Sequence, residues 1–262
     1  MDILSEIIAS KRSRLETTKR ALPLEEMQAT ALSARANAKA HALRNALAGD
    51  ATNIIAEFKR RSPSKGTIRE NADPATLARS YESAGAAAIS VVTEESYFAG
   101  SLEDLQAVRA QVSIPVLRKD FVFDEWQVHE SAAAGADALL LIVAALDDET
   151  LGRLLRLTEE NLGMDALVEV HTREEMGRAV ARGAKLIGVN NRDLRTFAVC
   201  TETSFQLAQF APSNTVLVSE SGLTPDELPN LRAAGYRGFL IGETLMRATD
   251  PERQLRAFRG EN

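Results

Sequence analysis

The chain has 262 residues, of which 45% are hydrophobic, 26% are charged and 5% are aromatic. These proportions are ordinary for a globular protein and exclude the disordered, collagen-like and disulfide-scaffold classes. The formal net charge is −6, whereas a domain that binds duplex nucleic acid is expected to be basic. We therefore expect no nucleic-acid partner.

The cysteine and histidine content limits metal and disulfide chemistry. Cys200 is the single cysteine, which excludes an intramolecular disulfide, and the three histidines lack the spacing of a metal motif. No apolar run reaches the roughly 18 residues of a membrane span, and the N-terminal residues lack the apolar core of a signal peptide. We expect a cytoplasmic protein with no membrane partner and no metal site.

A short glycine pattern recurs four times along the chain, in residues 84–89, 134–139, 182–187 and 234–239. Its glycines are about 50 residues apart, and a regular period of this length indicates a repeated structural unit. Each copy follows a helix-like stretch and precedes an apolar run. We interpret each glycine as a left-handed residue that ends a helix just before a buried strand.

Four further apolar runs lie between these units, in residues 54–59, 115–120, 166–170 and 215–221. All eight runs are short, rich in Val, Ile and Leu, and scarcely alternating, which is typical of strands covered on both faces. The spacing leaves room for one helix after each strand. We predict the α/β class and a closed (β/α)8 TIM barrel formed by residues 54–262, in a chain that is one domain.

Residues 1–53 precede the first predicted unit, are charged and rich in alanine, and place Ile3, Ile7 and Ile8 on one side of a helix. We expect an N-terminal helical extension that either packs on the outside of the barrel or caps its mouth. Helix starts are also predicted at Asp73-Pro74 and at Thr224, where Thr224 and Glu227 form a capping box.

Charged residues close several of the apolar strands, at the ends where such barrels carry their chemistry. Because side chains alternate along a strand, Lys119 shares a face with Leu117, and Glu169 shares one with Leu167. The same reasoning brings one set to the mouth: Glu57, Lys59, Lys119, Glu169, Asn190, Arg192 and Glu220. Burial of unpaired charge is costly, so the set predicts a proton-transfer site. The alternative is a rim of structural ion pairs.

A phosphate site is predicted after the last two strands, where Ser221, Gly222 and Gly242 could offer backbone N–H groups to an anion. Glu243 argues against this unless its side chain turns away. The basic loop at 59–66, which contains Ser62, is interpreted as a mobile loop over an anionic substrate. His171 follows Glu169 and is either a catalytic residue or a loop residue at the strand end, and we favour the loop residue. We interpret Cys200 as inert.

Residues 57–66, 92–102, 117–121, 167–171, 188–194 and 219–222 resemble the signature segments of the indole-3-glycerol-phosphate synthase family. The segments fall in order on successive strand ends, and the resemblance covers essentially the whole chain. No second barrel follows, so the resemblance is to the monofunctional form.

The resemblance implies a carboxy-lyase of tryptophan biosynthesis. The implied substrate is 1-(2-carboxyphenylamino)-1-deoxyribulose 5-phosphate, a small anionic aromatic phosphate, and the products are indole-3-glycerol phosphate, CO2 and water. The family implies no cofactor and no metal. A monomer or a weak homo-oligomer is expected.

The resemblance also implies roles for individual residues. Lys119 is the general acid of condensation, while Lys59 pairs with the substrate carboxylate or acts as a second acid. Glu169 takes part in proton transfer with Glu57 nearby, and Asn190 and Glu220 orient the substrate. The remaining implied contacts are with the phosphate, from Arg192, Ser221, Gly222 and Gly242 with Ser62 close by, and with the aromatic ring, from Phe121 and Phe98.

Two other functions are compatible with the same pattern. The first is another phosphate-binding barrel, an isomerase or an aldolase, in which Lys119 would form a Schiff base that borohydride traps. The second is a barrel kept only for binding, which would be expected to have lost the charges at its mouth.

Overall fold

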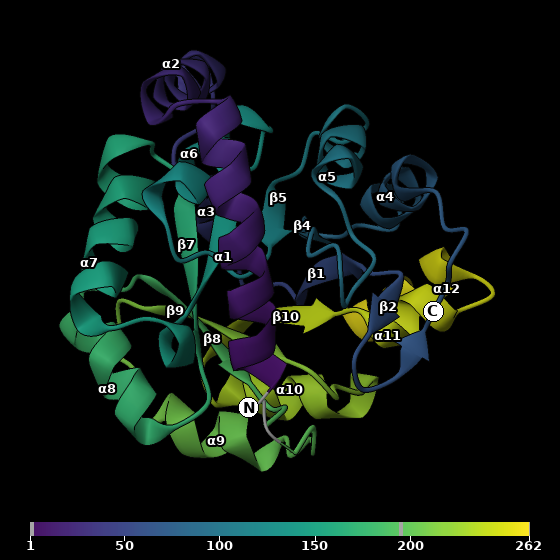
Figure 1. Cartoon of the computed structure of the whole chain (residues 1–262). Coiled ribbons are helices and arrows are strands. Elements are labelled where there is room, and N and C mark those ends of the chain that lie inside the picture. The colour runs from purple at the N-terminus through teal and green to yellow at the C-terminus, as the bar shows by residue number, and fades with distance from the viewer. Residues whose placement is uncertain (1–2, 194–195, 262) are drawn as a thin grey trace.

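The computed structural model describes residues 3–193 and 196–261, so Met1, Leu194 of the sixth strand-end segment and Asn262 lie outside it. Eight parallel strands close into a barrel in the order β1-β10-β9-β8-β7-β6-β5-β4 (Figure 1). They are β1 Asn53–Phe58, β4 Ala88–Val92, β5 Val116–Lys119, β6 Ala138–Ile142, β7 Asp165–Val170, β8 Leu186–Asn190, β9 Val216–Glu220 and β10 Tyr236–Ile241. The predicted (β/α)8 fold is confirmed.

Helices surround the strands and connect them along the chain. They are α4 Pro74–Ser83, α5 Leu102–Arg109, α6 Glu125–Ala133, α7 Asp148–Arg156, α8 Arg173–Ala181, α9 Glu202–Ala208, α10 Leu228–Ala233, α11 Glu243–Arg247 and α12 Pro251–Arg259. Short turns of other helix types occupy Val143–Ala145, Leu157–Asn161 and Pro225–Glu227. The predicted starts are confirmed, since Asp73 caps α4 and Thr224 forms the capping box with Glu227.

The repeated glycines end helices as predicted. Gly85, Gly135, Gly183 and Gly235 have φ values of 88°, 90°, 83° and 106°, in the left-handed region that other residues rarely adopt. Each therefore reverses the chain direction between a helix and the next buried strand.

The barrel interior explains why charges gather at one end. Ile55, Leu117, Leu167 and Val218 belong to one buried apolar cluster inside the barrel. Because side chains alternate along a strand, the next inward position lies two residues further toward the carboxyl end. Those positions are occupied by Glu57, Lys119, Glu169 and Glu220, so a charged layer lies directly above an apolar one.

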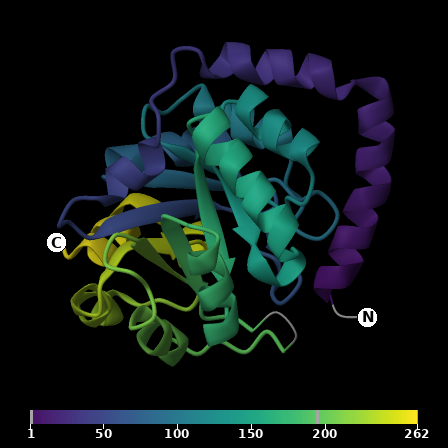
Figure 2. The same cartoon turned by 90° about the vertical axis from the view of Figure 1, so that its left-hand side faces the viewer.

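The N-terminal extension forms three helices with different positions: α1 Ile3–Ala21, α2 Leu24–Arg35 and α3 Ala42–Leu47. Figure 2 shows α1 and α2 as an L-shaped strap along two sides of the barrel. α2 packs against α6, as expected for a helix on the outside. α1 reaches the mouth, while Leu43 and Leu47 of α3 join the interior cluster. The extension thus fits both sequence interpretations, in different parts.

The basic loop after β1 contains a small hairpin that the sequence did not predict, formed by β2 Arg61–Ser62 and β3 Gly66–Thr67. Arg60 anchors its base through an ion pair with Asp104 and lies over the ring of Phe58. Among the described residues, no helix is long and apolar enough to cross a membrane.

Candidate active site

A cavity of about 940 Å³ opens at the carboxyl ends of the barrel strands. Every residue predicted for the site contributes to its lining. They are Glu57, Lys59, Ser62, Lys119, Phe121, Glu169, Asn190, Arg192, Glu220, Ser221, Gly222 and Gly242. The structure therefore brings the whole predicted set to one place.

Lys119 lies at the centre of the charged layer. Its Nζ is 3.3 Å from Oε2 of Glu169 and 3.2 Å from Oε2 of Glu220, on two other strands. Burial favours the neutral amine, but the carboxylates of Glu220, Glu169 and Glu57 outweigh it and raise the pKa of Lys119 above its ordinary value. Lys119 is therefore a protonated donor at neutral pH.

Glu57 and Lys59 form a second pair on the first strand and the residues after it. Glu57 is only 3% exposed, and its Oε1 contacts Nζ of Lys59. Burial would raise the pKa of Glu57, but Lys59 and Lys119 hold it below the ordinary value. Gly242 makes room for this carboxylate, since a Cβ at that position would collide with Oε1 of Glu57.

The carboxylates of Glu169 and Glu220 differ in protonation although they share Lys119. Burial would raise both pKa values, but Lys119 and His171 bring that of Glu169 down to about 2. For Glu220, burial outweighs the attraction of Lys119 and the nearby Glu169 adds to it, which leaves its pKa raised to about 7. The site thus holds one firmly ionised carboxylate and one that exchanges a proton near neutral pH, a combination suited to acid–base chemistry.

The charges pair with one another, as the alternative of a structural rim predicted. Ion pairs at a rim would be exposed to solvent, whereas Glu169 and Glu220 are 2% and 1% exposed and line a cavity. Structural pairs alone would not require space for another molecule beside them.

The loops after β9 and β10 meet at one side of the cavity. Ser221 and Gly222 have φ values of 69° and 74°, and α11 begins directly after Gly242. Glu243 forms an ion pair with Arg247 at 3.0 Å, although it still borders the cavity. Arg247 thus offsets part of the negative charge with which Glu243 would repel an anion bound here.

Arg192 approaches the same side of the cavity from the loop after β8. Its backbone N–H donates to Oδ1 of Asn190 at 3.0 Å, and its guanidinium donates to the carbonyl oxygen of Phe197 at 3.1 Å. The guanidinium has further N–H donors that can bind an anion.

Two aromatic rings border the opposite part of the cavity. Phe98 and Phe121 lie with their ring centroids 6.2 Å apart and their planes tilted by 42°. Leu140 and Ile142 of β6 extend this apolar lining. The wall offers a flat ring an apolar surface close to Lys119.

A buried polar network fixes the end of β5, and the sequence analysis did not predict it. Asp120 accepts hydrogen bonds from Thr93 at 2.7 Å and from the backbone of Phe121 at 2.8 Å. It also forms ion pairs with Lys11 at 2.9 Å and Arg118 at 3.0 Å. These two cations overcome the effect of burial and hold the pKa of Asp120 at about 2. The network anchors the segment that carries both Lys119 and Phe121.

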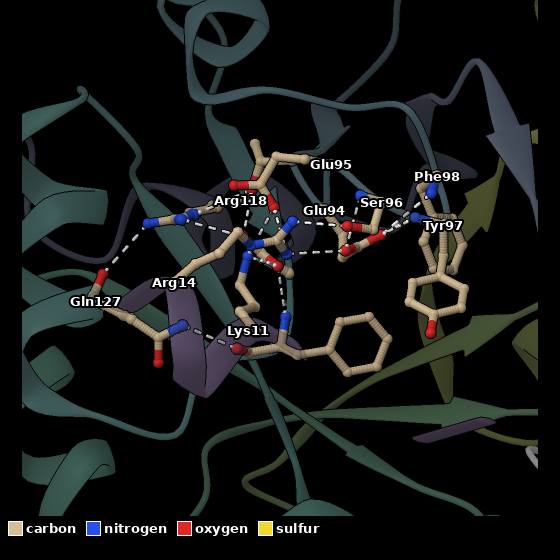
Figure 3. A network of polar contacts seen from close by, with 12 residues as sticks. Lys11, Arg14, Glu94, Glu95, Ser96, Tyr97, Phe98, Arg118 and Gln127 are labelled. Atoms are coloured by element: carbon tan, nitrogen blue, oxygen red, sulfur yellow. Dashed lines mark hydrogen bonds and ion pairs between the residues drawn. The ribbon is translucent and has the colours of Figure 1, made fainter. Parts of the chain in front are cut away.

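The same network holds the loop that carries Phe98 (Figure 3). The buried carboxylate of Glu94 accepts the backbone N–H groups of Ser96, Tyr97 and Phe98 at 3.0, 2.7 and 3.1 Å. Arg14 of α1 pairs with Glu94 at 3.3 Å. Helix α1 thus ties together two loops of the mouth, and its Ile3, Leu4 and Ile7 line the cavity.

The described residues contain no second centre built on a metal cluster or a buried cysteine. The described part of the chain contains no cluster of three or more His, Cys, Asp or Glu side chains that could hold a metal ion. Cys200 is exposed on the loop after β8. His171 follows β7 and contacts Glu169 at 3.4 Å, which a plain loop residue would not be expected to do.

Fold and site together define a class: a TIM-barrel enzyme with acid–base residues at the carboxyl mouth of its strands. Residues 4–258 match the family model described as indole-3-glycerol phosphate synthase. The chain belongs to the indole-3-glycerol phosphate synthase family, which are carboxy-lyases of tryptophan biosynthesis.

Relatives bearing that name match over most of their length. The protein of Micrococcus luteus is 49% identical over 265 residues, covering 99% of this chain and 97% of its own. That of Bacteroides thetaiotaomicron is 45% identical over 258 residues, covering 98% and 97%. That of a Nocardioides species is 53% identical over 210 residues, covering 80% of each chain.

Solved structures also resemble the barrel at low sequence identity. A 3-hexulose-6-phosphate synthase has a TM-score of 0.64 at 16% identity, covering 80% of this chain and 99% of its own. The thiamine phosphate pyrophosphorylase of Pyrococcus furiosus has a TM-score of 0.60 at 14% identity, covering 80% and 95%. At this identity they show the fold alone.

Proposed function

We propose that this chain closes the indole ring of 1-(2-carboxyphenylamino)-1-deoxyribulose 5-phosphate at the mouth of its barrel. The observation that carries the proposal is the position of Lys119, which stands between Glu169 and Glu220 in a cavity with an apolar wall. The products are indole-3-glycerol phosphate, CO2 and water.

The first step forms the carbon–carbon bond. The ring carbon that bears the carboxylate attacks the ketone carbon, and Lys119 donates a proton to the ketone oxygen as negative charge develops there. Phe98 and Phe121 support the aromatic ring. Lys59 pairs with the substrate carboxylate or acts as a second acid.

Two losses then complete the indole. The carboxylate leaves as CO2, and the electron pair of the broken bond restores the aromatic ring. The hydroxyl formed from the ketone leaves as water with a proton from a lysine, while Glu169 accepts the proton lost from the neighbouring carbon. Asn190 and Glu220 orient the substrate, and Glu57 keeps Lys59 in place.

The phosphate binds at the loops after β9 and β10 in this proposal. Backbone N–H groups near Ser221, Gly222 and Gly242 and the guanidinium of Arg192 contact its oxygens, with Ser62 closing over from the hairpin. Charge-assisted hydrogen bonds of this kind are shorter and stronger than neutral ones.

An aldolase mechanism is disfavoured by the charges around Lys119. A Schiff base requires a neutral amine, whereas three carboxylates raise the pKa of Lys119 despite its burial. Borohydride added with substrate is expected to leave the protein unlabelled and its activity recoverable.

Incubation with the anilino-deoxyribulose phosphate tests the proposal. The folded protein is expected to produce indole fluorescence, and the Lys119→Ala protein serves as the matched control. No fluorescence from folded wild-type protein would contradict the proposal.

We further propose that the chain is one domain, with residues 1–53 as an extension of the barrel, and that it acts as a monomer or weak homo-oligomer. The participation of α3 in the barrel interior supports the first point. A cytoplasmic location and a mobile loop at 59–66 stay predictions from the sequence.

A further inference from the structure

His171 follows β7 and lies between two carboxylates, outside the lining of the cavity. Its Nε2 is 3.4 Å from Oε1 of Glu169, and its Nδ1 is 3.2 Å from Oε2 of Glu175. Glu169 therefore has a basic side chain beside each of its oxygens, because Lys119 contacts Oε2. His171 does not itself line the cavity, so it reaches the reaction only through Glu169.

The start of α8 holds His171 in this position. Glu175 accepts the backbone N–H of His171 at 2.7 Å with the same oxygen that faces the ring. Thr172 caps the helix by accepting the backbone N–H of Glu175 at 3.2 Å. The imidazole is thus fixed by local backbone geometry, and its orientation is set before any substrate binds.

The two contacts determine the protonation of the ring. An ionised carboxylate only accepts hydrogen bonds, and a neutral imidazole has one donor nitrogen. Nδ1 of His171 lies within hydrogen-bond distance of Glu175, and Nε2 faces Glu169 at ion-pair distance, so a proton on both nitrogens satisfies both carboxylates. Burial opposes this charge, but Glu169 and Glu175 outweigh it and raise the pKa of His171 to about 10.

Among the described residues of α8 and the adjoining loops, His171 is the one basic side chain that contacts Glu169. Arg178, on the next turn of α8, is engaged by Asp148 at 2.7 Å and by the carbonyl oxygens of Val143 and Leu146. The charged groups that face Glu169 from the surrounding strands are Lys119, Glu220 and Glu57. Without His171, one lysine would have to neutralise both Glu169 and Glu220.

We propose that His171 is a positioning residue whose permanent positive charge keeps Glu169 ionised and aimed at the cavity, so that the exchangeable proton of the cluster resides on Glu220. This inference rests on the proposed function, in which Glu169 is the carboxylate that accepts a substrate proton. It assigns to His171 control over which of two neighbouring carboxylates acts as the base.

The first test needs no substrate. Side-chain ¹⁵N NMR of the wild-type protein, with the His171→Gln spectrum for assignment, follows both ring nitrogens between pH 6 and pH 9. We expect His171 to give imidazolium shifts throughout this range. Titration near the ordinary histidine value of about 6.5 would overturn the inference.

The second test compares the pH dependence of kcat. In His171→Gln, Glu169 loses one of its cations, so its pKa rises and kcat falls about tenfold for each pH unit below that value. KM stays close to wild type because the side chain does not touch the cavity. In the wild type, kcat is expected to stay constant as the pH falls, because Glu169 stays ionised. His171→Lys retains a cation and is expected to restore part of this constant kcat at low pH.

His41→Gln is the matched control. His41 pairs with Asp165 at 3.3 Å, at the opposite end of the same strand, and is expected to leave the kcat profile unchanged. Circular dichroism confirms that each variant is folded. If wild type forms indole but His171→Gln keeps the wild-type profile, the inference fails; if wild type forms no indole, the proposed function fails, and the NMR result still decides the charge of His171.

Discussion

Substitution of Lys119 by alanine removes the cation that joins two strands of the site. Its Nζ is 3.3 Å from Glu169 and 3.2 Å from Glu220, and the substitution leaves both carboxylates facing each other without it. Like charges at close range raise carboxyl pKa values, so the variant loses its acid and also disturbs its base.

The size of the effect follows from these two losses. A general acid contributes about 10²–10⁴-fold, which corresponds to about 3–5 kcal/mol of the barrier. Since the base is disturbed as well, we expect kcat of Lys119→Ala to fall by at least about 10²-fold, with a smaller change in KM.

Lys119→Arg separates proton donation from charge. The guanidinium keeps a positive charge beside both carboxylates but does not release its proton at neutral pH. Its kcat is expected to fall as in the alanine variant, while its unfolding midpoint in urea stays nearer to wild type. Indole fluorescence gives the rates, and a folded Lys119→Ala protein with kcat within tenfold of wild type would refute the reasoning.

Three further predictions concern binding, packing and pH. Arg192→Ala is expected to raise KM about 10–100-fold through loss of a charged hydrogen bond, and an unchanged KM would argue against phosphate contact. Leu47 is 0% exposed inside the barrel, and Leu47→Ala is expected to lower the free energy of unfolding by about 2–5 kcal/mol. The same change at Leu32, which is 57% exposed, should cost less than about 0.5 kcal/mol, and equal losses would contradict the interior position of α3. The pKa of Glu220 is raised from 4.5 in the unfolded chain to about 7 in the folded protein. Its contribution to the free energy of unfolding is therefore fully present below pH 4.5 and is lost as the pH rises through 7. In urea unfolding, the stability of Glu220→Gln relative to wild type should therefore increase over this range, by up to about 1.4 kcal/mol per pH unit, whereas a constant difference would contradict the assignment.

The strands could be predicted because burial on both faces leaves a clear pattern. A strand such as β6 is apolar throughout, and Gly135 marks the turn that precedes it. The inward charges followed from alternation alone, since Lys119 is two residues beyond Leu117. These features depend on the local sequence and on a fold in which each strand has the same environment.

Features that depend on distant partners could not be predicted in the same way. Lys11 is an ordinary charged residue in its helix, and only the packing of α1 brings it to Asp120. Leu43 and Leu47 lie one turn apart in an alanine-rich stretch that could equally have covered the outside of the barrel. The hairpin of β2 and β3 is too short to produce a periodic pattern.

The contact between His171 and Glu169 could have been predicted from the sequence around them. It lies two residues beyond Glu169, so the alternation that places Glu169 also predicts a shared face. Thr172 and Glu175 have the spacing of a capping box, which fixes the chain direction after the strand. Together these two patterns would have predicted a histidine held against the carboxylate.

The most direct test of the central claim measures both products of ring closure together. Substrate labelled with ¹³C in its carboxyl group is incubated with the wild-type protein, and labelled CO2 and indole-3-glycerol phosphate are quantified over time. We expect the two to form in equal amounts, and Lys119→Ala to slow both equally. Release of labelled CO2 without indole, or no release from folded protein, would contradict ring closure by this site.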